Sequence, residues 1–255
     1  MALSAIVTTY NEERVIGRCL AALAFSDEVV VVDSFSADCT IAIAEQHGAR
    51  VLSHEYTSPA AQKNWAIPQA RGEWILIVDA DELVTPGLAD EIRRVISSPG
   101  ARDGYWIRRR NRFLGREIRW SGWQRDWVLR LFRKDRGRYL DRQVHERLEV
   151  AGTVGRLREP MLHDSYRTLD DYWRKLDRYA TWGAAEARRR GERVSPARLL
   201  LHPPLRFLKA YLLQGGILDG GAGLAVCLLT AISAAAKDLR IWEQQLSAAG
   251  RGRQR

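Results

Sequence analysis

The sequence has few cysteines, little lysine and no long, uniformly apolar run, and each scarcity excludes a class of protein. Its three cysteines, Cys19, Cys39 and Cys227, are too few and too widely spaced for a disulfide framework or a zinc site. We therefore expect a reducing compartment. The first residues lack the basic lead of a secretory signal peptide, so we do not expect export.

One stretch comes nearest to a transmembrane segment. Residues 220–236 carry no charge, but glycine, alanine, serine and threonine dilute them, and they fall short of the usual run of about 20 apolar residues. Residues 198–242 mix leucine-rich runs with basic residues and tryptophan. This pattern is typical of an amphipathic helix at a bilayer surface, although a helical hairpin packed on a catalytic domain would also produce it. We expect a cytoplasmic protein, peripheral on the anionic inner face of the cytoplasmic membrane.

Lysine is scarce although the chain is basic. Forty lysines and arginines exceed thirty-one acidic residues, which gives a net charge of +9, and lysine occurs only at positions 63, 134, 175, 209 and 237. The other basic residues are arginines, which form paired hydrogen bonds with phosphates and carboxylates. The surplus favours an anionic partner: nucleic acid, an acidic membrane or a phosphorylated substrate. A genome rich in G and C would produce the same surplus without any function.

The first hundred residues alternate strands and helices. Short runs rich in valine and isoleucine predict buried strands at 3–9, 28–33, 49–53 and 74–79. Asn11 and Ser36 are candidate helix caps, Gly48 marks a helix end, and Thr85 precedes a proline at a helix start. Strands separated by single helices predict an α/β, Rossmann-like fold with a mixed, mainly parallel sheet flanked by helices.

The chain changes character after residue 100 and again near residue 165. The middle segment mixes short strands, at 104–108 and 127–132, with dense arginine and tryptophan, whereas the last ninety residues have helical spacing. We expect residues 1–100 and 101–165 to form two halves of one domain. Residues 166–255 would then be a helical C-terminal extension.

Polar clusters follow three of the predicted strands. They are Thr8-Thr9-Tyr10-Asn11-Glu12-Glu13, Asp33-Ser34 and Asp79-Ala80-Asp81-Glu82. Each could be a simple turn, but parallel strands end at one edge of a sheet, where ligands bind. Asp79 and Asp81 can face one cavity, and two such carboxylates need a cation to offset their repulsion. Their oxygens suit Mg²⁺ or Mn²⁺.

These clusters resemble glycosyltransferase family 2, which has the GT-A fold. The motifs, within residues 1 to about 150, are Val7-Thr8-Thr9-Tyr10-Asn11-Glu12, Val-Val-Asp33-Ser-Phe-Ser-Ala-Asp38 and Asp79-Ala80-Asp81. Shorter pieces resemble the branch with lipopolysaccharide-core β-1,4-glucosyltransferases: Val144-His145-Glu146, Leu162-His163-Asp164-Ser165-Tyr166, Lys175-Leu-Asp-Arg-Tyr179-Ala180 and Gly216-Ile-Leu-Asp219-Gly220. The resemblance implies an inverting, metal-dependent transfer of a hexose, expected to be glucose from a UDP-sugar, to a hydroxyl of a saccharide or lipid-linked acceptor such as lipopolysaccharide core.

The family pattern also implies roles for single residues. The residues that would line the nucleotide pocket are Thr9, Tyr10, Asn11 and Glu12. Asp33 would accept a hydrogen bond from the base, which is uracil in most relatives. Lys63 or Asn64 would lie near the ribose or the diphosphate. Residues 1–100 would thus bind the nucleotide sugar, and residues 101–165 the acceptor.

The same pattern implies a metal site around Asp79-Ala80-Asp81. Asp81 would bind Mg²⁺ or Mn²⁺ directly, and Asp79 would contact the ribose or a metal-bound water. Some GT-A enzymes complete this site with a late histidine, and His163 is the candidate here. The alternative for His163 is an ordinary hydrogen-bonded structural role.

The acceptor hydroxyl needs a base within hydrogen-bond reach as it attacks. The sequence offers Glu146, beside His145, and Asp126, which lies in a Trp-Gln-Arg-Asp-Trp segment like those that hold the base in many relatives. We favour Glu146 and keep Asp126 as the alternative. An ion pair between Glu146 and an arginine is the structural alternative.

Residues 102–133 hold ten arginines and four tryptophans. Arginine with aromatic residues can bind single-stranded nucleic acid, but the chain shows no nucleic-acid-binding module, so we expect no specific nucleic-acid partner. Acceptor and diphosphate recognition is the favoured interpretation. Two other functions stay open. One is a sugar-phosphate nucleotidyltransferase, which would usually have a glycine-rich loop after the first strand. The other is a non-catalytic basic module that binds membranes or nucleic acid.

Overall fold

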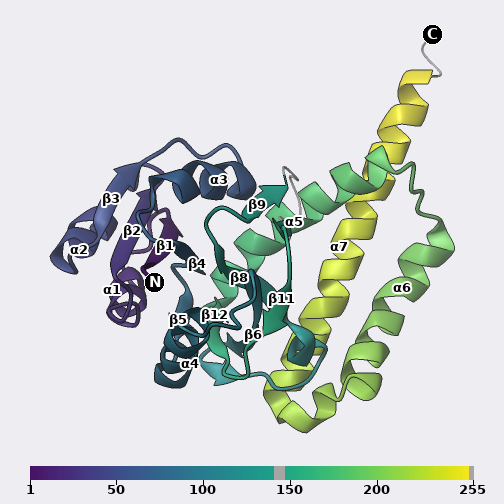
Figure 1. The fold of residues 1–255 in the computed structure, drawn as a ribbon. Coiled ribbons are helices and arrows are strands. Elements are labelled where there is room, and N and C mark those ends of the chain that lie inside the picture. The colour runs from purple at the N-terminus through teal and green to yellow at the C-terminus, as the bar shows by residue number, and fades with distance from the viewer. Residues whose placement is uncertain (141–146, 253–255) are drawn as a thin grey trace. The chain divides into compact units, whose positions relative to one another are not determined.

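The computed structural model describes residues 1–140 and 147–252 (Figure 1). The strands are β1 (Leu3–Thr9), β2 (Glu28–Asp33), β3 (Arg50–Ser53), β4 (Trp74–Asp79), β5 (Glu82–Val84), β6 (Gly104–Phe113), β7 (Arg116–Glu117), β8 (Trp127–Arg133), β9 (Gly137–Leu140), β10 (Arg147–Val150), β11 (Val154–Arg156) and β12 (Met161–Tyr166). The helices are α1 (Ile16–Ala21), α2 (Thr40–Gln46), α3 (Pro59–Gln69), α4 (Pro86–Ile96), α5 (Leu169–Arg189), α6 (Pro196–Leu208) and α7 (Gly220–Gly252), with short turns η1 (Trp123–Arg125), η2 (Lys209–Leu213) and η3 (Gly216–Asp219).

The chain divides into two compact units. The sheet unit comprises Met1–Arg110 and Arg125–Asp164, and the helical unit comprises Asn111–Gln124 and Ser165–Arg255. Residues 111–124, which the sequence pattern groups with the strand-rich middle segment, therefore belong with the C-terminal helices. Their backbone explains this, because Arg119 and Trp120 donate hydrogen bonds to the carboxylate of Asp219 in η3.

The main sheet has the strand order β3-β2-β1-β4-β8-β6-β12-β5. Strands β3, β2, β1 and β4 are parallel to their neighbours, and β8 joins β4 in the antiparallel sense. The predicted α/β class, a mixed sheet flanked by helices with a helical C-terminal region, is confirmed. The register pairs Thr9 with Asp33 and Thr8 with Asp79, so the polar ends of β1, β2 and β4 lie at one edge.

Alternating side chains of these strands bury both faces of the sheet. On one face Ala5 and Val7 pack with the apolar residues of α1, α2 and α4. On the other, Ile6, Ile75 and Ile77 pack with α3. Successive side chains of a strand point to opposite faces, so a strand covered on both sides reads as an unbroken apolar run. This is why the sequence predicted these four strands closely.

Two of the predicted helix caps are wrong. Helix α1 begins at Ile16 and α2 at Thr40, and neither has a side-chain cap, so Asn11 and Ser36 do not cap them. Both residues instead lie in the loops after β1 and β2, described below. Thr85, before Pro86, does form a cap: its hydroxyl accepts a hydrogen bond from the N–H of Leu88 in α4.

The helical unit is built on α5 and α7, with α6 beside α7 (Figure 1). The hydroxyl of Tyr172 on α5 bonds to the carbonyl of Leu229 at 2.6 Å and lies 2.7 Å from the hydroxyl of Ser233, both on α7. The turn between α6 and α7 is tight. A side chain at Gly223 would overlap the backbone of Gly216, so glycine is needed there.

Candidate active site

Asp79, the last residue of β4, lies between two buried cations of the sheet unit. The ammonium of Lys63 on α3 is 3.2 Å from one carboxylate oxygen, and the guanidinium of Arg130 on β8 pairs with the other. The side chains of Lys63 and Arg130 are 3% and 5% exposed, against 32% for Asp79. Burial acts to raise the pKa of Asp79, but the charges of Arg130, Lys63 and Arg109 hold that pKa well below its usual range.

Glu82 stabilises the positions of Asp79 and Arg130 through a hydrogen bond and an ion pair. Its side chain is fully buried, and it accepts a hydrogen bond of 2.9 Å from the backbone N–H of Asp79. The same carboxylate pairs with Arg109 at 3.1 Å and with Arg130 at 3.3 Å. Glu82 therefore fixes both the backbone of the Asp-Ala-Asp segment and a cation that neutralises Asp79.

Arg109 of β6 extends the network to Asp126. Its guanidinium donates two hydrogen bonds, of 3.0 and 2.9 Å, one to each carboxylate oxygen of Asp126. Burial acts to lower the pKa of Arg109, but the negative charges of Glu82 and Asp126 raise it above its ordinary value. Both oxygens of Asp126 are thus engaged by a cation, and one would have to be released before it could take a proton from an acceptor.

Asp81 lies near His163 of β12. A carboxylate oxygen of Asp81 is 3.7 Å from Nε2 of His163, and the two side chains are 17% and 16% exposed. The antiparallel register of β12 and β5, which pairs His163 with Glu82, brings the histidine there. The backbone N–H of Asp164 also donates to the carbonyl of Asp81 at 2.9 Å.

This pair fits a divalent metal, because a carboxylate oxygen and an imidazole nitrogen are both usual ligands. Asp79 is already neutralised by Lys63 and Arg130, so its carboxylate is not needed at the metal. Among the described residues, no group of three or more histidine, cysteine, aspartate or glutamate side chains could hold a metal ion.

The loops after β1 and β2 are joined by hydrogen bonds. The N–H of Asn11 donates to the hydroxyl of Ser36, and the side-chain oxygen of Asn11 accepts from the N–H of Ala37, each at 2.8 Å. The N–H of Glu12 donates to the hydroxyl of Thr40 at 2.8 Å. These side chains join the two loops rather than capping helices.

Asp33 is enclosed beneath the same loops. Its side chain is fully buried, and its two oxygens accept hydrogen bonds from Ser36, one from the N–H at 2.7 Å and one from the hydroxyl at 2.5 Å. The contact with the base that the family resemblance implies for Asp33 stays a prediction, and the carboxylate also holds the loop after β2. Thr9 beside it is only 6% exposed, and its hydroxyl has no hydrogen-bond partner in the described part of the chain. Buried hydroxyls are usually bonded, so a ligand group is a suitable partner.

Three exposed aromatic side chains follow β1, β2 and β3. Tyr10, Phe35 and Tyr56 are 59%, 63% and 49% exposed. The N–H of His54 donates to the carbonyl of Asp33 at 2.9 Å, which ties the loop after β3 to the end of β2. Phe35 has φ of 62°, a left-handed conformation that is unfavourable for a bulky residue. Sequence reasoning found Tyr10 and missed Phe35, because backbone strain has no signal in composition or spacing.

The structure separates Lys63 from Asn64, which the sequence left as alternatives. The side chain of Asn64 pairs reciprocally with the backbone of Tyr139, donating to its carbonyl at 2.8 Å and accepting from its N–H at 2.9 Å. Asn64 therefore anchors β9 to α3, and Lys63 points to Asp79. Glu146 and His145 lie outside the described residues.

Sequence reasoning also missed the roles of Glu82, Arg109 and Arg130. A signal existed for Arg130, because it is the one charge inside the apolar run Trp127–Phe132. A lone arginine in a strand that is otherwise apolar needs a buried partner. Glu82 directly follows Asp79-Ala80-Asp81 in the sequence, but this position does not show which way its side chain points.

Replacing Glu82 by glutamine tests whether the network depends on its charge. Glu82→Gln leaves two buried guanidinium groups without that countercharge, and we expect the free energy of unfolding to fall by about 3–5 kcal/mol. Chemical denaturation measures this. The matched control, Glu73→Gln, changes an exposed glutamate before β4 and should shift stability by less than about 0.5 kcal/mol. Equal stabilities for the two variants would contradict the role given to Glu82.

Comparisons with known proteins were made on the whole chain. The model of the family described as glycosyl transferase family 2 matches residues 4–155. Among curated proteins, the chain is 29% identical over 243 residues to the lipopolysaccharide core biosynthesis glycosyltransferase LpsC of Rhizobium meliloti (strain 1021), with 90% of each chain covered.

Two solved structures are also similar. The crystal structure of S. aureus TarS 1–349 is 17% identical, with 97% of this chain and 92% of that chain covered and a TM-score of 0.48. The crystal structure of glucosyl-3-phosphoglycerate synthase from Mycobacterium tuberculosis in complex with Mn²⁺, uridine diphosphate and glucosyl-3-phosphoglycerate is 21% identical, with 44% of each chain covered and a TM-score of 0.36.

Proposed function

The chain belongs to glycosyl transferase family 2 and is a glycosyltransferase, and we propose that it moves a hexose from a nucleoside diphosphate sugar to a hydroxyl group by direct, inverting displacement. The observation that carries this proposal is the pairing of Asp81 with His163 beside a separately neutralised Asp79, at the edge where the parallel strands end. That edge therefore offers a place for a cation beside a carboxylate that is already neutralised, within one unit.

The cations of the edge neutralise Asp79 and so reduce its repulsion of the diphosphate of the donor. Lys63 and Arg130 carry positive charge next to Asp79, and Glu82 keeps Arg130 in place. Asp81 and His163 would hold the divalent metal, Mg²⁺ or Mn²⁺, which when bound supplies positive charge to stabilise the leaving diphosphate. The partner that Thr9 lacks among the described residues would be a polar group of the nucleotide.

Inverting displacement is a single step, in which the acceptor oxygen attacks the anomeric carbon while the bond from that carbon to the diphosphate oxygen breaks. One base is therefore enough. The base removes the proton of the attacking hydroxyl, and the nucleoside diphosphate leaves with the bond electrons. We propose Glu146 as this base. Asp126 is the weaker candidate, because both of its oxygens accept hydrogen bonds from Arg109.

The proposals for the donor and the acceptor rest on the chemistry of the site and on similarity to known proteins. We propose UDP-glucose as the donor and a saccharide or lipid-linked acceptor such as lipopolysaccharide core, in line with the printed name of the R. meliloti relative. Such an acceptor would place the enzyme in the cytoplasm, peripheral on the inner face of the cytoplasmic membrane. Membership of family 2 removes support from the nucleotidyltransferase and from the non-catalytic basic module.

The first test removes the proposed metal ligand. Asp81→Asn should lower kcat/KM for sugar transfer by roughly 100-fold or more, because it weakens stabilisation of charge on the leaving group. The measurement is a panel of nucleotide sugars, assayed with and without Mn²⁺, with UDP-glucose expected to be preferred. Asp90→Asn, an exposed aspartate on α4, is the control and should keep full activity. Full activity in Asp81→Asn, or no preference for any nucleotide sugar, would refute the proposal.

A second test concerns Phe35, which we propose stacks on the base of the donor. Phe35→Gly should raise the free energy of unfolding by about 1 kcal/mol, since glycine accepts positive φ. It should also weaken binding of UDP by about tenfold, because base stacking is lost. The opposite signs separate a binding role from a structural one.

The matched control for Phe35→Gly is Leu114→Gly. Leu114 also has a positive φ, of 49°, and is 45% exposed, but it lies in the helical unit. It should gain stability in the same way and bind UDP like the wild type. Calorimetric titration and denaturation measure both properties. Unchanged UDP affinity in Phe35→Gly would rule out the stacking role.

A further inference from the structure

The hairpin of α6, its turn and α7 exposes many large apolar side chains. Helix α6 has no buried residue at all. The exposed residues on α6 and the turn are Leu200, Leu201, Leu205, Leu208, Leu212, Leu213, Ile217 and Leu218. Those on α7 are Leu224, Leu228, Ile232, Leu239 and Leu246. At the turn, Leu213 is 84% exposed, so this apolar surface is continuous from one helix to the other.

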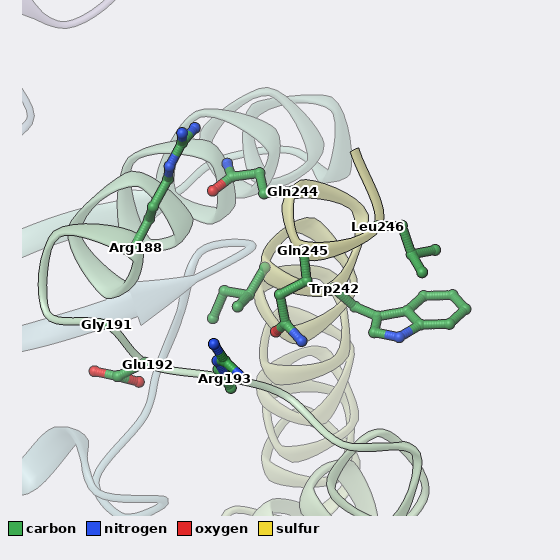
Figure 2. Close-up of a pocket in the computed structure, with 9 residues that line it drawn as sticks. Arg188, Gly191, Glu192, Arg193, Trp242, Gln244, Gln245 and Leu246 are labelled. Atoms are coloured by element: carbon green, nitrogen blue, oxygen red, sulfur yellow. The ribbon is translucent and has the colours of Figure 1, made fainter. Parts of the chain in front are cut away.

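Most of the exposed apolar residues of each helix fall on one stripe. On α7 they recur at intervals of four and seven residues from Leu224 to Leu246, which keeps them on one face of the helix. On α6, Leu201, Leu205 and Leu208 follow the same rule. Figure 2 shows the polar end of α7, where Trp242 and Leu246 point away from Arg188 of α5 and line a hollow of about 550 Å³. Leu246 is exposed and belongs to the stripe, whereas Trp242 packs partly against a cluster formed by α5 and α7.

A cluster around the buried carboxylate of Asp238 fixes the two helices to each other. Asp238 of α7 is fully buried and pairs with Arg198 at 3.0 Å and with His202 at 2.5 Å, both on α6. Asp238 lies where α7 changes from apolar to polar. Residues 220–236 carry no charge, and Lys237 is the first charged residue after them. The cluster therefore fixes the position of α6 along α7, at the point where α7 changes from apolar to polar.

Membrane contact of this hairpin can take two forms. A helix spanning Gly216–Ser247 is long and apolar enough to cross a bilayer, and only 17% of its most apolar window is buried. Because Asp238 ties α6 to α7, a spanning α7 would carry the exposed side chains of Arg206 and Lys209 into the bilayer as well. Charges within the hydrocarbon are expensive, whereas long basic side chains at an interface reach back to the lipid phosphates.

We infer that the α6–α7 hairpin is a monotopic membrane element that lies in the surface of a bilayer containing anionic lipid. Its leucine stripes and the turn at 212–218 enter the boundary between headgroups and acyl chains, and Arg206 and Lys209 contact lipid phosphates. The bilayer is the occupant that matches both the apolar stripes and the basic residues beside them. This inference rests on the proposed function, which includes a membrane partner. At the bilayer surface the enzyme would have access to a lipid-linked acceptor.

Flotation of the full chain with lipid vesicles tests the inference without any transfer assay. We expect binding to vesicles with about 30% phosphatidylglycerol to exceed binding to phosphatidylcholine alone. The double variant Leu205→Asp and Leu213→Asp changes exposed residues, so it should fold, and it should partition roughly tenfold less or worse. Arg206→Glu with Lys209→Glu should lose the preference for anionic lipid. The control, Leu169→Asp, alters an exposed leucine of α5 outside the stripes and should bind like the wild type.

A fluorophore on Leu218→Cys then distinguishes the two forms of membrane contact. A quencher near the headgroups should reduce its emission more than a quencher at the bilayer centre. Stronger quenching from the centre would replace the interfacial hairpin with a spanning helix. Failure of the wild type to bind vesicles, or leucine variants that bind normally, would overturn the inference, as would a solution dimer that the leucine variants abolish. Because lipid binding needs no nucleotide sugar, these failures are separate from failure of the proposed transfer.

Discussion

The carboxyl edge of the sheet depends on the neutralisation of Asp79 by cations of the sheet unit. A carboxylate between buried groups is costly unless it is paired, and each cation that pairs with it needs a further partner. The chain meets this requirement with a network in which positive and negative groups alternate: Lys63, Asp79, Arg130, Glu82, Arg109 and Asp126. The network joins α3, β4, β5, β6 and β8, so it couples the positions of elements far apart in the sequence.

Because of this network, the many arginines of the chain have separate roles. Arg109 and Arg130 are largely buried and serve the architecture of the edge, so they are not simply a basic surface. Lys63, one of only five lysines, is held at the same place. Other basic residues lie beside the apolar stripes of the helical unit, where a lipid surface would be their partner. The net charge of +9 is therefore a sum over different functions.

The sequence predicted the fold class well, including the GT-A type implied by its family resemblance, because parallel strands and their crossover helices leave strong local patterns. Thr85 before Pro86 gave a correct helix start for the same reason. Asn11 and Ser36 were misjudged because their polar groups are satisfied across two loops, and contacts over such a distance leave no local pattern.

The candidate site was predicted only in part. Asp79 and Asp81 were identified as a pair, and the family resemblance named His163 as a candidate beside Asp81. The sequence could not show that buried cations engage Asp79. The position of His163 near Asp81 arises from the pairing of β12 with β5, about 80 residues apart along the chain. Asp33 shows the same limit, since its burial depends on how the loop folds over it.

Asp79 belongs to the cation network, and we propose that Asp81 and His163, within the part of the chain that the structure describes, are protein ligands of the metal. Titration of the protein with Mn²⁺, followed by electron paramagnetic resonance with and without UDP, tests it most directly. Two protein ligands bind a metal weakly until phosphate oxygens complete the shell, so we expect UDP to increase Mn²⁺ affinity by roughly tenfold or more. Tight Mn²⁺ binding without nucleotide, or no Mn²⁺ binding in the presence of UDP, would contradict the account.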